Sequence, residues 1–177
     1  ATHIPLTCTT SPIYDSQGQL IGVLDISALS SPKPKDSQAL ALQLVKLFTR
    51  QIEDAAFLHR HRRNWVLRLA SAPQFLDVNP EFLLALDSTG CVVGHNRGAQ
   101  TGMTTADGQG VLGRHISDLL EIRFEDLGKF MAGDNALHRA VMQANGSGLL
   151  FMIVTPPPVP SIYRAQKELS MPAPLAA

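Results

Sequence analysis

The 177 residues carry no net charge at neutral pH; 45% of them are hydrophobic and 17% are charged. A neutral chain has no long-range attraction to nucleic acid or to an anionic membrane surface. No stretch has the roughly eighteen consecutive apolar residues of a membrane-spanning helix, and the first residues lack the layout of a signal peptide. These features predict a cytoplasmic protein of one or two small domains.

The first predicted element is a β-hairpin. Residues 7–14 have the alternating, β-branched pattern of a strand, residues 15–18 form a polar turn, and residues 20–26 are apolar. Gly18 can adopt the positive φ that a short turn requires. We expect the second strand to be buried on both faces. Because an isolated hairpin is marginally stable in water, it should belong to a larger sheet.

A long helix is predicted after the hairpin. Pro32 and Pro34 end the second strand, and Asp36 or Ser37 is expected to be the N-cap of a helix over residues 38–64. Apolar residues recur at helical spacing along one stripe, and a second side is also apolar. A helix with two apolar sides must bury both, which predicts a homodimer in which the long helices of two copies pack together. The residues expected at this dimer interface are Leu40, Leu44, Val45, Leu47, Phe48, Ile52 and Leu58.

The second half of the chain repeats the strand–turn–strand pattern. Strands are predicted over residues 82–86 and 91–95, and Asn96 is a suitable N-cap for a short helix over residues 97–103. Further short helices are expected over residues 116–121 and 137–144, followed by a buried strand over residues 149–154. A proline-rich stretch follows. The predicted fold class is therefore α+β, with two small modules joined by a long helix.

The sequence holds none of the motifs GxxxxGK[ST], HExxH, GxSxG or CxxC. We accordingly expect no catalytic residue, no metal site and no cofactor. Cys8 and Cys91 are expected to be buried, reduced thiols; a thiol-dependent enzyme that uses Cys8 is the alternative. The basic run over residues 59–63 is expected to be the solvated end of the long helix, where the helix dipole favours cations. A charge partner within a dimer, or DNA, is the alternative contact for this run.

Several stretches resemble known sensory domains. The sequence CTTSPIYDSQGQLIGVLDIS resembles the last two strands of a GAF domain, and the long helix after it is similar to the helix that leaves such domains. The sequence FLLALDSTGCVVGHNRGAQTG, with GRHISDLL after it, resembles the opening of a PAS domain. Taken in this order, residues 7–154 resemble the N-terminal sensory region of sigma-54-dependent transcriptional activators of the acetoin catabolism regulator type.

The resemblance implies a domain organisation. Residues 1–35 would be the end of a GAF-like domain, residues 36–66 a connecting and dimerisation helix, and residues 78–155 a PAS-like domain. Residues 156–177 would be a linker toward a downstream AAA+ ATPase domain.

The resemblance also implies a function in signal sensing, without catalysis. A small effector such as acetoin would be bound, and the candidate ligand-binding residues are Arg97, Arg114 and His115. DNA and sigma-54 RNA polymerase would be reached only through domains outside this chain. The alternative is the sensory region of a histidine kinase or a cyclase, which uses the same modules.

Overall fold

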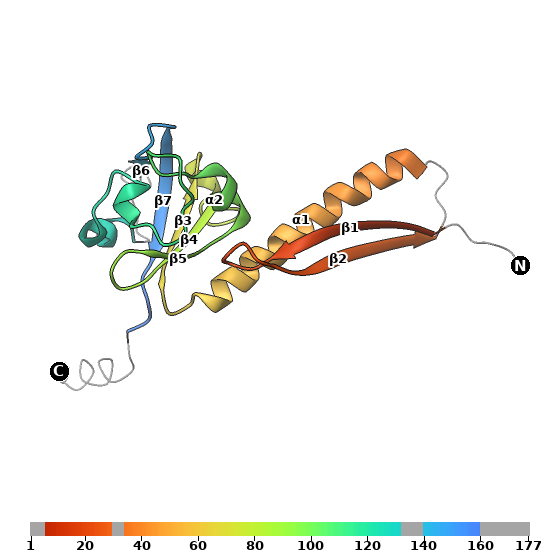
Figure 1. The fold of residues 1–177 in the computed structure, drawn as a ribbon, viewed down its shortest axis with the longest axis horizontal. Coiled ribbons are helices and arrows are strands. Elements are labelled where there is room, and N and C mark those ends of the chain that lie inside the picture. Colours follow the sequence, from red (N-terminus) through yellow and green to blue (C-terminus); the bar gives the residue numbers. More distant parts are fainter. Residues whose placement is uncertain (1–5, 30–33, 132–139, 160–177) are drawn as a thin grey trace, which may run out of the picture.

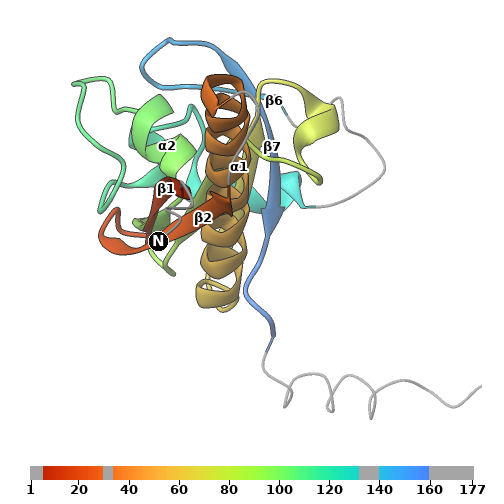
Figure 2. The same ribbon diagram turned by 90° about the vertical axis from the view of Figure 1, so that its right-hand side faces the viewer.

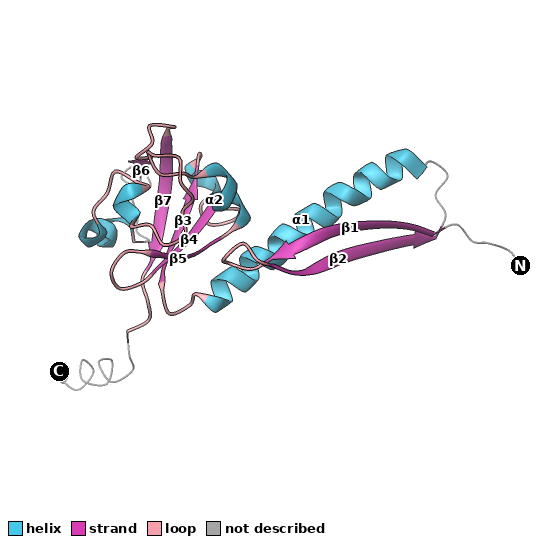
Figure 3. Cartoon of the chain, viewed as in Figure 1, coloured by secondary structure: helices cyan, strands magenta, loops and turns pink. Residues whose placement is uncertain are grey.

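The computed structural model describes residues 6–29, 34–131 and 140–159, and it has an α+β fold, as predicted. An elongated arm made of a β-hairpin and a long helix extends from a more compact module built on a second antiparallel sheet (Figure 1; coloured by secondary structure in Figure 3). The elements of the arm are β1 (Leu6–Tyr14), β2 (Leu20–Leu29) and α1 (Pro34–Arg60). The elements of the sheet module are β3 (Trp65–Ala70), η1 (Pro73–Phe75), β4 (Phe82–Leu86), β5 (Val92–His95), α2 (Arg97–Gly102), η2 (Ile116–Asp118), η3 (Phe124–Phe130), β6 (Ala140–Met142) and β7 (Leu149–Thr155).

The hairpin forms where the sequence predicts it. β1 and β2 pair antiparallel, and Gly18 in the turn has a φ of 78°. The prediction that the second strand is buried on both faces is wrong, because Leu20, Ile21 and Val23 are 61–65% exposed. In the described residues the hairpin is a two-stranded sheet of its own, and α1 covers one of its faces. Viewed end-on, the two strands lie beside α1 (Figure 2).

The long helix begins and ends four residues earlier than predicted. Its first residue is Pro34, so Asp36 and Ser37 lie inside the first turn and neither is the N-cap. Proline suits the first helical position because its φ is fixed near the helical value and the missing N–H has no acceptor there anyway. The helix ends at Arg60, with His59 and Arg60 in its last turn. The prediction that residues 59–63 are the solvated end of the helix is wrong at His61, which lies beyond the helix and is 5% exposed.

In the described part of the chain, the sheet of the second module has five antiparallel strands in the order β5-β4-β3-β7-β6. Its central strand, β3, was not predicted, because WVLRLA follows the basic run without a turn signal. Trp65 opens this strand and packs edge-on against Phe124, with ring centroids 5.9 Å apart. The strand predicted over residues 82–86 is confirmed, as is the buried strand that begins at Leu149.

The sheet module buries both faces of its sheet. On one face, Leu67, Leu69, Leu84 and Leu86 pack with residues from the helices and loops between β5 and β7. On the other face, Val66, Leu83 and Ala85 pack against Phe57 near the C-terminal end of α1. The end of α1 is therefore part of the core of the sheet module, and the same helix also packs on the hairpin.

Two other predictions differ from the structure. Residues 140–144 were expected at the end of a helix, but Ala140–Met142 form β6, paired with β7; residues 137–139 lie outside the described residues. A short hydrophobic segment at a sheet edge cannot be told from a buried helix by periodicity alone. The helix expected over residues 116–121 is reduced to a 3-10 turn over Ile116–Asp118.

Candidate functional site

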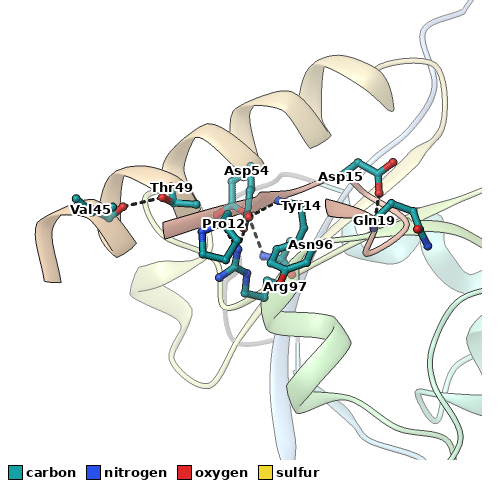
Figure 4. A network of polar contacts seen from close by, with 10 residues as sticks. Pro12, Tyr14, Asp15, Gln19, Val45, Thr49, Asp54, Asn96 and Arg97 are labelled. Carbon is teal, nitrogen blue, oxygen red and sulfur yellow. Dashed lines mark hydrogen bonds and ion pairs between the residues drawn. The ribbon is translucent and has the colours of Figure 1, made fainter. Parts of the chain in front are cut away.

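The arm meets the sheet module at a small, mostly buried group of polar residues, which we call the junction. The junction is formed by Tyr14, Ser16, Glu53, Asp54, His61, His95, Asn96 and Arg97. These side chains come from the end of β1 and the hairpin turn, from α1 and the loop after it, and from β5 and the start of α2 (Figure 4 shows part of the network). Three segments that are distant in the sequence therefore share one set of hydrogen bonds.

Glu53 and Arg97 form the ion pair at the centre of the junction. The carboxylate of Glu53 is 5% exposed and also accepts a hydrogen bond of 2.7 Å from the backbone N–H of Tyr14. Arg97 donates a second bond of 2.8 Å from Nη2 to the carbonyl of Pro12, and its guanidinium lies 4.7 Å from the centre of the Tyr14 ring. One ion pair thus holds the end of β1 against both α1 and α2.

Asn96 links α1 to the start of α2. As predicted, it is the N-cap of α2, and its Oδ1 accepts hydrogen bonds from the backbone N–H groups of Ala99 and Leu83. Its Nδ2 donates to Oδ1 of Asp54 on α1 at 3.1 Å. Burial raises the pKa of Asp54 above its ordinary value, and the hydrogen bond from Asn96 opposes this increase.

Two buried histidines complete the junction. Nε2 of His61 lies 2.9 Å from Oγ of Ser16 in the hairpin turn, and the carbonyl of Ser16 accepts a hydrogen bond of 2.8 Å from the backbone N–H of His95. The approach of His61 leaves no room for a side chain at Gly94, where an added Cβ would lie 2.4 Å from Nε2. Burial lowers the pKa of both imidazoles below the ordinary value of 6.5.

The lowered histidine pKa values predict that the chain is less stable in mild acid. Below pH 6.5 the unfolded chain binds protons at His61 and His95 more readily than the folded chain does. The two neutral histidines therefore make their full contribution to the free energy of unfolding above pH 6.5. This contribution decreases as the pH falls toward their lowered pKa values. Asp15, which faces His95, partly opposes this effect, whereas Arg60 reinforces it at His61.

This pH dependence can be measured as the melting temperature between pH 7.5 and pH 5.5, above the pKa range of ordinary carboxylates. The raised pKa of Asp54 acts in the opposite direction to the histidines. We expect a lower melting temperature at the acidic end, and a smaller decrease for His61→Gln. The same decrease in the variant would contradict a role for His61.

The cavity at the junction is too small to hold a metabolite. Its volume is about 10 Å³, which is space for about one water molecule. Three larger hollows in the described residues are open surface depressions: one of about 550 Å³ beside η3, one of about 460 Å³ beside Arg114, and one of about 230 Å³ between α1 and α2. The junction therefore connects the arm to the sheet module and does not enclose a ligand-sized cavity.

The three predicted ligand-binding residues do not come together. Arg97 lies in the junction, whereas Arg114 lines a separate depression near Asp107 and Asp118. His115 is the N-cap of η2, where its Nδ1 accepts a hydrogen bond of 3.3 Å from the backbone N–H of Ser117. Arg114 and His115 therefore lie apart from Arg97. Their role in ligand binding stays a prediction.

The predicted dimer residues divide into two groups. Val45 is fully buried, so it presents no surface to a partner, and Leu58 is partly buried against the sheet core. The others remain 42–64% exposed along α1; they are Leu40, Leu44, Leu47, Phe48 and Ile52. We call these five residues the α1 stripe. Dimerisation stays a prediction, and the expected interface is now limited to this stripe.

The two cysteines differ from the prediction of buried thiols. Both are free; Cys8 is exposed and Cys91 is partly buried. Sγ of Cys8 lies 3.4 Å from Oγ of Ser27 on the paired strand. Among the described side chains no group of His, Cys, Asp and Glu could hold a metal ion. No described helix is long and apolar enough to cross a membrane.

Sequence comparison identifies one similar curated protein. The chain is 47% identical, over 182 aligned residues that cover all of it, to the acetoin catabolism regulatory protein of Cupriavidus necator. It spans 27% of the length of that protein. This similarity confirms the resemblance to acetoin catabolism regulators, and the relative is named as a regulatory protein. No protein-family model matches the chain. No solved structure matches it either.

Proposed function

We propose that this chain is the sensory and signal-transmitting segment of a sigma-54-dependent transcriptional regulator of acetoin catabolism. The observation that carries the proposal is the 47% identity over the whole chain to an acetoin catabolism regulatory protein. The segment would have no catalytic activity of its own. It would control an ATPase and a DNA-binding domain that lie outside this chain, in the cytoplasm.

The geometry supports a role in transmission. α1 contacts the hairpin and, through Phe57, the sheet core, so a change in either part alters the packing of the same helix. The junction connects the two parts by an ion pair and by hydrogen bonds that have a defined geometry. In the proposal, effector binding shifts the population between two arrangements of the arm on the sheet module.

We also propose that the regulator is a homodimer that pairs through the α1 stripe. Five large apolar side chains, each at least 42% exposed, follow one side of a 27-residue helix. An unpaired hairpin edge and a contiguous apolar surface both favour association. A second copy supplies the same stripe, and two such stripes can pack as a pair of helices around a two-fold axis.

A genetic experiment tests the function. The gene that contains this chain is deleted, and transcription of the acetoin catabolism genes is measured with a reporter, with and without acetoin. We expect acetoin-dependent induction to be lost on deletion and to return when the full-length gene is restored. Unchanged induction in the deletion strain would contradict the proposed function.

A further inference from the structure

Beyond the regulatory role, we propose that the chain binds a small oxyanion, a phosphate or carboxylate group, in a basic depression between α1 and α2. The depression has a volume of about 230 Å³ and is lined by Lys46, Arg50, Arg97, Gly98 and Thr101. Three of these five described residues are cationic and none is acidic.

The cations are brought together by the fold. Lys46 and Arg50 are one helical turn apart on α1, and Arg97 reaches the same place from the first turn of α2. Two like charges at this spacing on a helix destabilise it slightly in the absence of an anion. Two carboxylates lie near these cations. Glu53 pairs with Arg97 and with the backbone of Tyr14. Asp54 accepts a hydrogen bond from Asn96 and interacts electrostatically with Arg50.

Both guanidinium groups are held in place by hydrogen bonds from their Nη2 atoms, and the Nε of each has no acceptor among the described residues. Arg50 donates from Nη2 to the carbonyls of Pro80 and Glu81 over 3.5 and 3.4 Å, and Arg97 is anchored by Glu53 and Pro12. In the described part of the chain, the Nε atoms of both arginines are buried without a hydrogen-bond partner. Unsatisfied buried donors are uncommon in proteins, and these two belong to the guanidinium groups that line the depression.

These features favour an oxyanion over a neutral ligand. Guanidinium groups present several N–H donors in a planar fork that matches carboxylate and phosphate oxygens, and a lysine adds a point charge. The hydroxyl of Thr101 donates to the carbonyls of Arg97 and Gly98, so it offers only lone pairs to the depression. Recognition therefore depends on the three cations.

The site would also be coupled to the junction, because Arg97 belongs to both. An anion in the basic depression competes with Glu53 for the guanidinium of Arg97. Occupancy would thus alter the contact that holds β1 against α1 and α2.

Titration of the 177-residue chain with inorganic phosphate, followed by NMR of the backbone amides, tests the proposal. A parallel titration with succinate tells a phosphate site from a carboxylate site, and sodium chloride at equal ionic strength controls for screening. We expect saturable shifts at residues 46, 50 and 97–101 with phosphate or with succinate. Lys46→Gln should raise the dissociation constant about fivefold, equivalent to about 1 kcal/mol, with the fold retained.

Lys129→Gln is the matched control, since Lys129 pairs with Asp126 on η3. This variant should bind like the unmodified chain. The proposal is wrong if neither anion gives saturable shifts at these residues, or if Lys46→Gln and Lys129→Gln have equal effects. Because binding is measured directly, either result would leave the proposed regulatory function standing.

Discussion

Glu53→Ala is expected to lower the free energy of unfolding by about 2–3 kcal/mol. Removal of one partner of a buried ion pair typically costs about 3–5 kcal/mol because the other charge is left without compensation. The effect should be smaller here because Arg97 is 38% exposed and can turn toward water. The loss also removes the acceptor for the backbone N–H of Tyr14. Denaturant unfolding measures the change.

Two further variants separate the components of this effect. Glu53→Gln keeps an oxygen for the N–H of Tyr14 and loses the charge, so it should be less destabilising than Glu53→Ala. Glu121 is exposed and lies outside the junction, and Glu121→Ala should change stability by less than about 0.5 kcal/mol. Equal stability of all the variants would show that the arm is held to the sheet module without the ion pair.

Phe48→Asp is expected to weaken the proposed dimer at least about thirtyfold, which corresponds to about 2 kcal/mol. Phe48 is 47% exposed within one chain, so about half of its surface is available to a partner. In a dimer it would place a charge in an apolar interface without a partner. Analytical ultracentrifugation over a dilution series measures the association, and circular dichroism verifies that the helix is retained.

The matched control for this prediction is Phe75→Asp. Phe75 is 49% exposed but lies in η1 of the sheet module, away from the α1 stripe. The Phe75→Asp variant should dimerise like the unmodified chain. A monomeric unmodified chain at micromolar concentration, or equal effects of the two substitutions, would contradict dimerisation through the stripe.

The elements with a local signature could be predicted from the sequence. The turn at Gly18, the strand over residues 82–86 and the cap at Asn96 each depend on residues adjacent in the chain. β3 could not be recognised in this way, because its six residues gain their stability from β4 and β7 on either side. β6 was missed for the same reason, since its three residues are a strand only through their pairing with β7.

The junction was only partly accessible from the sequence. Asn96 and Arg97 were singled out, whereas Glu53, Ser16 and His61 were not. The sequence held a signal for Glu53. Val45, Thr49, Glu53 and Phe57 follow one another at four-residue spacing, on the buried face of α1. A carboxylate on a buried helix face needs a partner. Ser16 and His61 meet through the tertiary fold, 45 residues apart, and no local pattern predicts that contact.

The central claim is that the junction transmits the signal, and acetoin-dependent transcription by the full-length regulator tests it most directly. Glu53→Gln and the control Glu121→Gln are introduced into the full-length gene, protein levels are matched, and the ratio of induced to uninduced transcription is measured. The account predicts that Glu53→Gln changes this ratio at least about fivefold, the effect of about 1 kcal/mol of coupling, while Glu121→Gln leaves it unchanged. An unchanged ratio in Glu53→Gln, with the protein folded and acetoin still inducing transcription, would contradict the account.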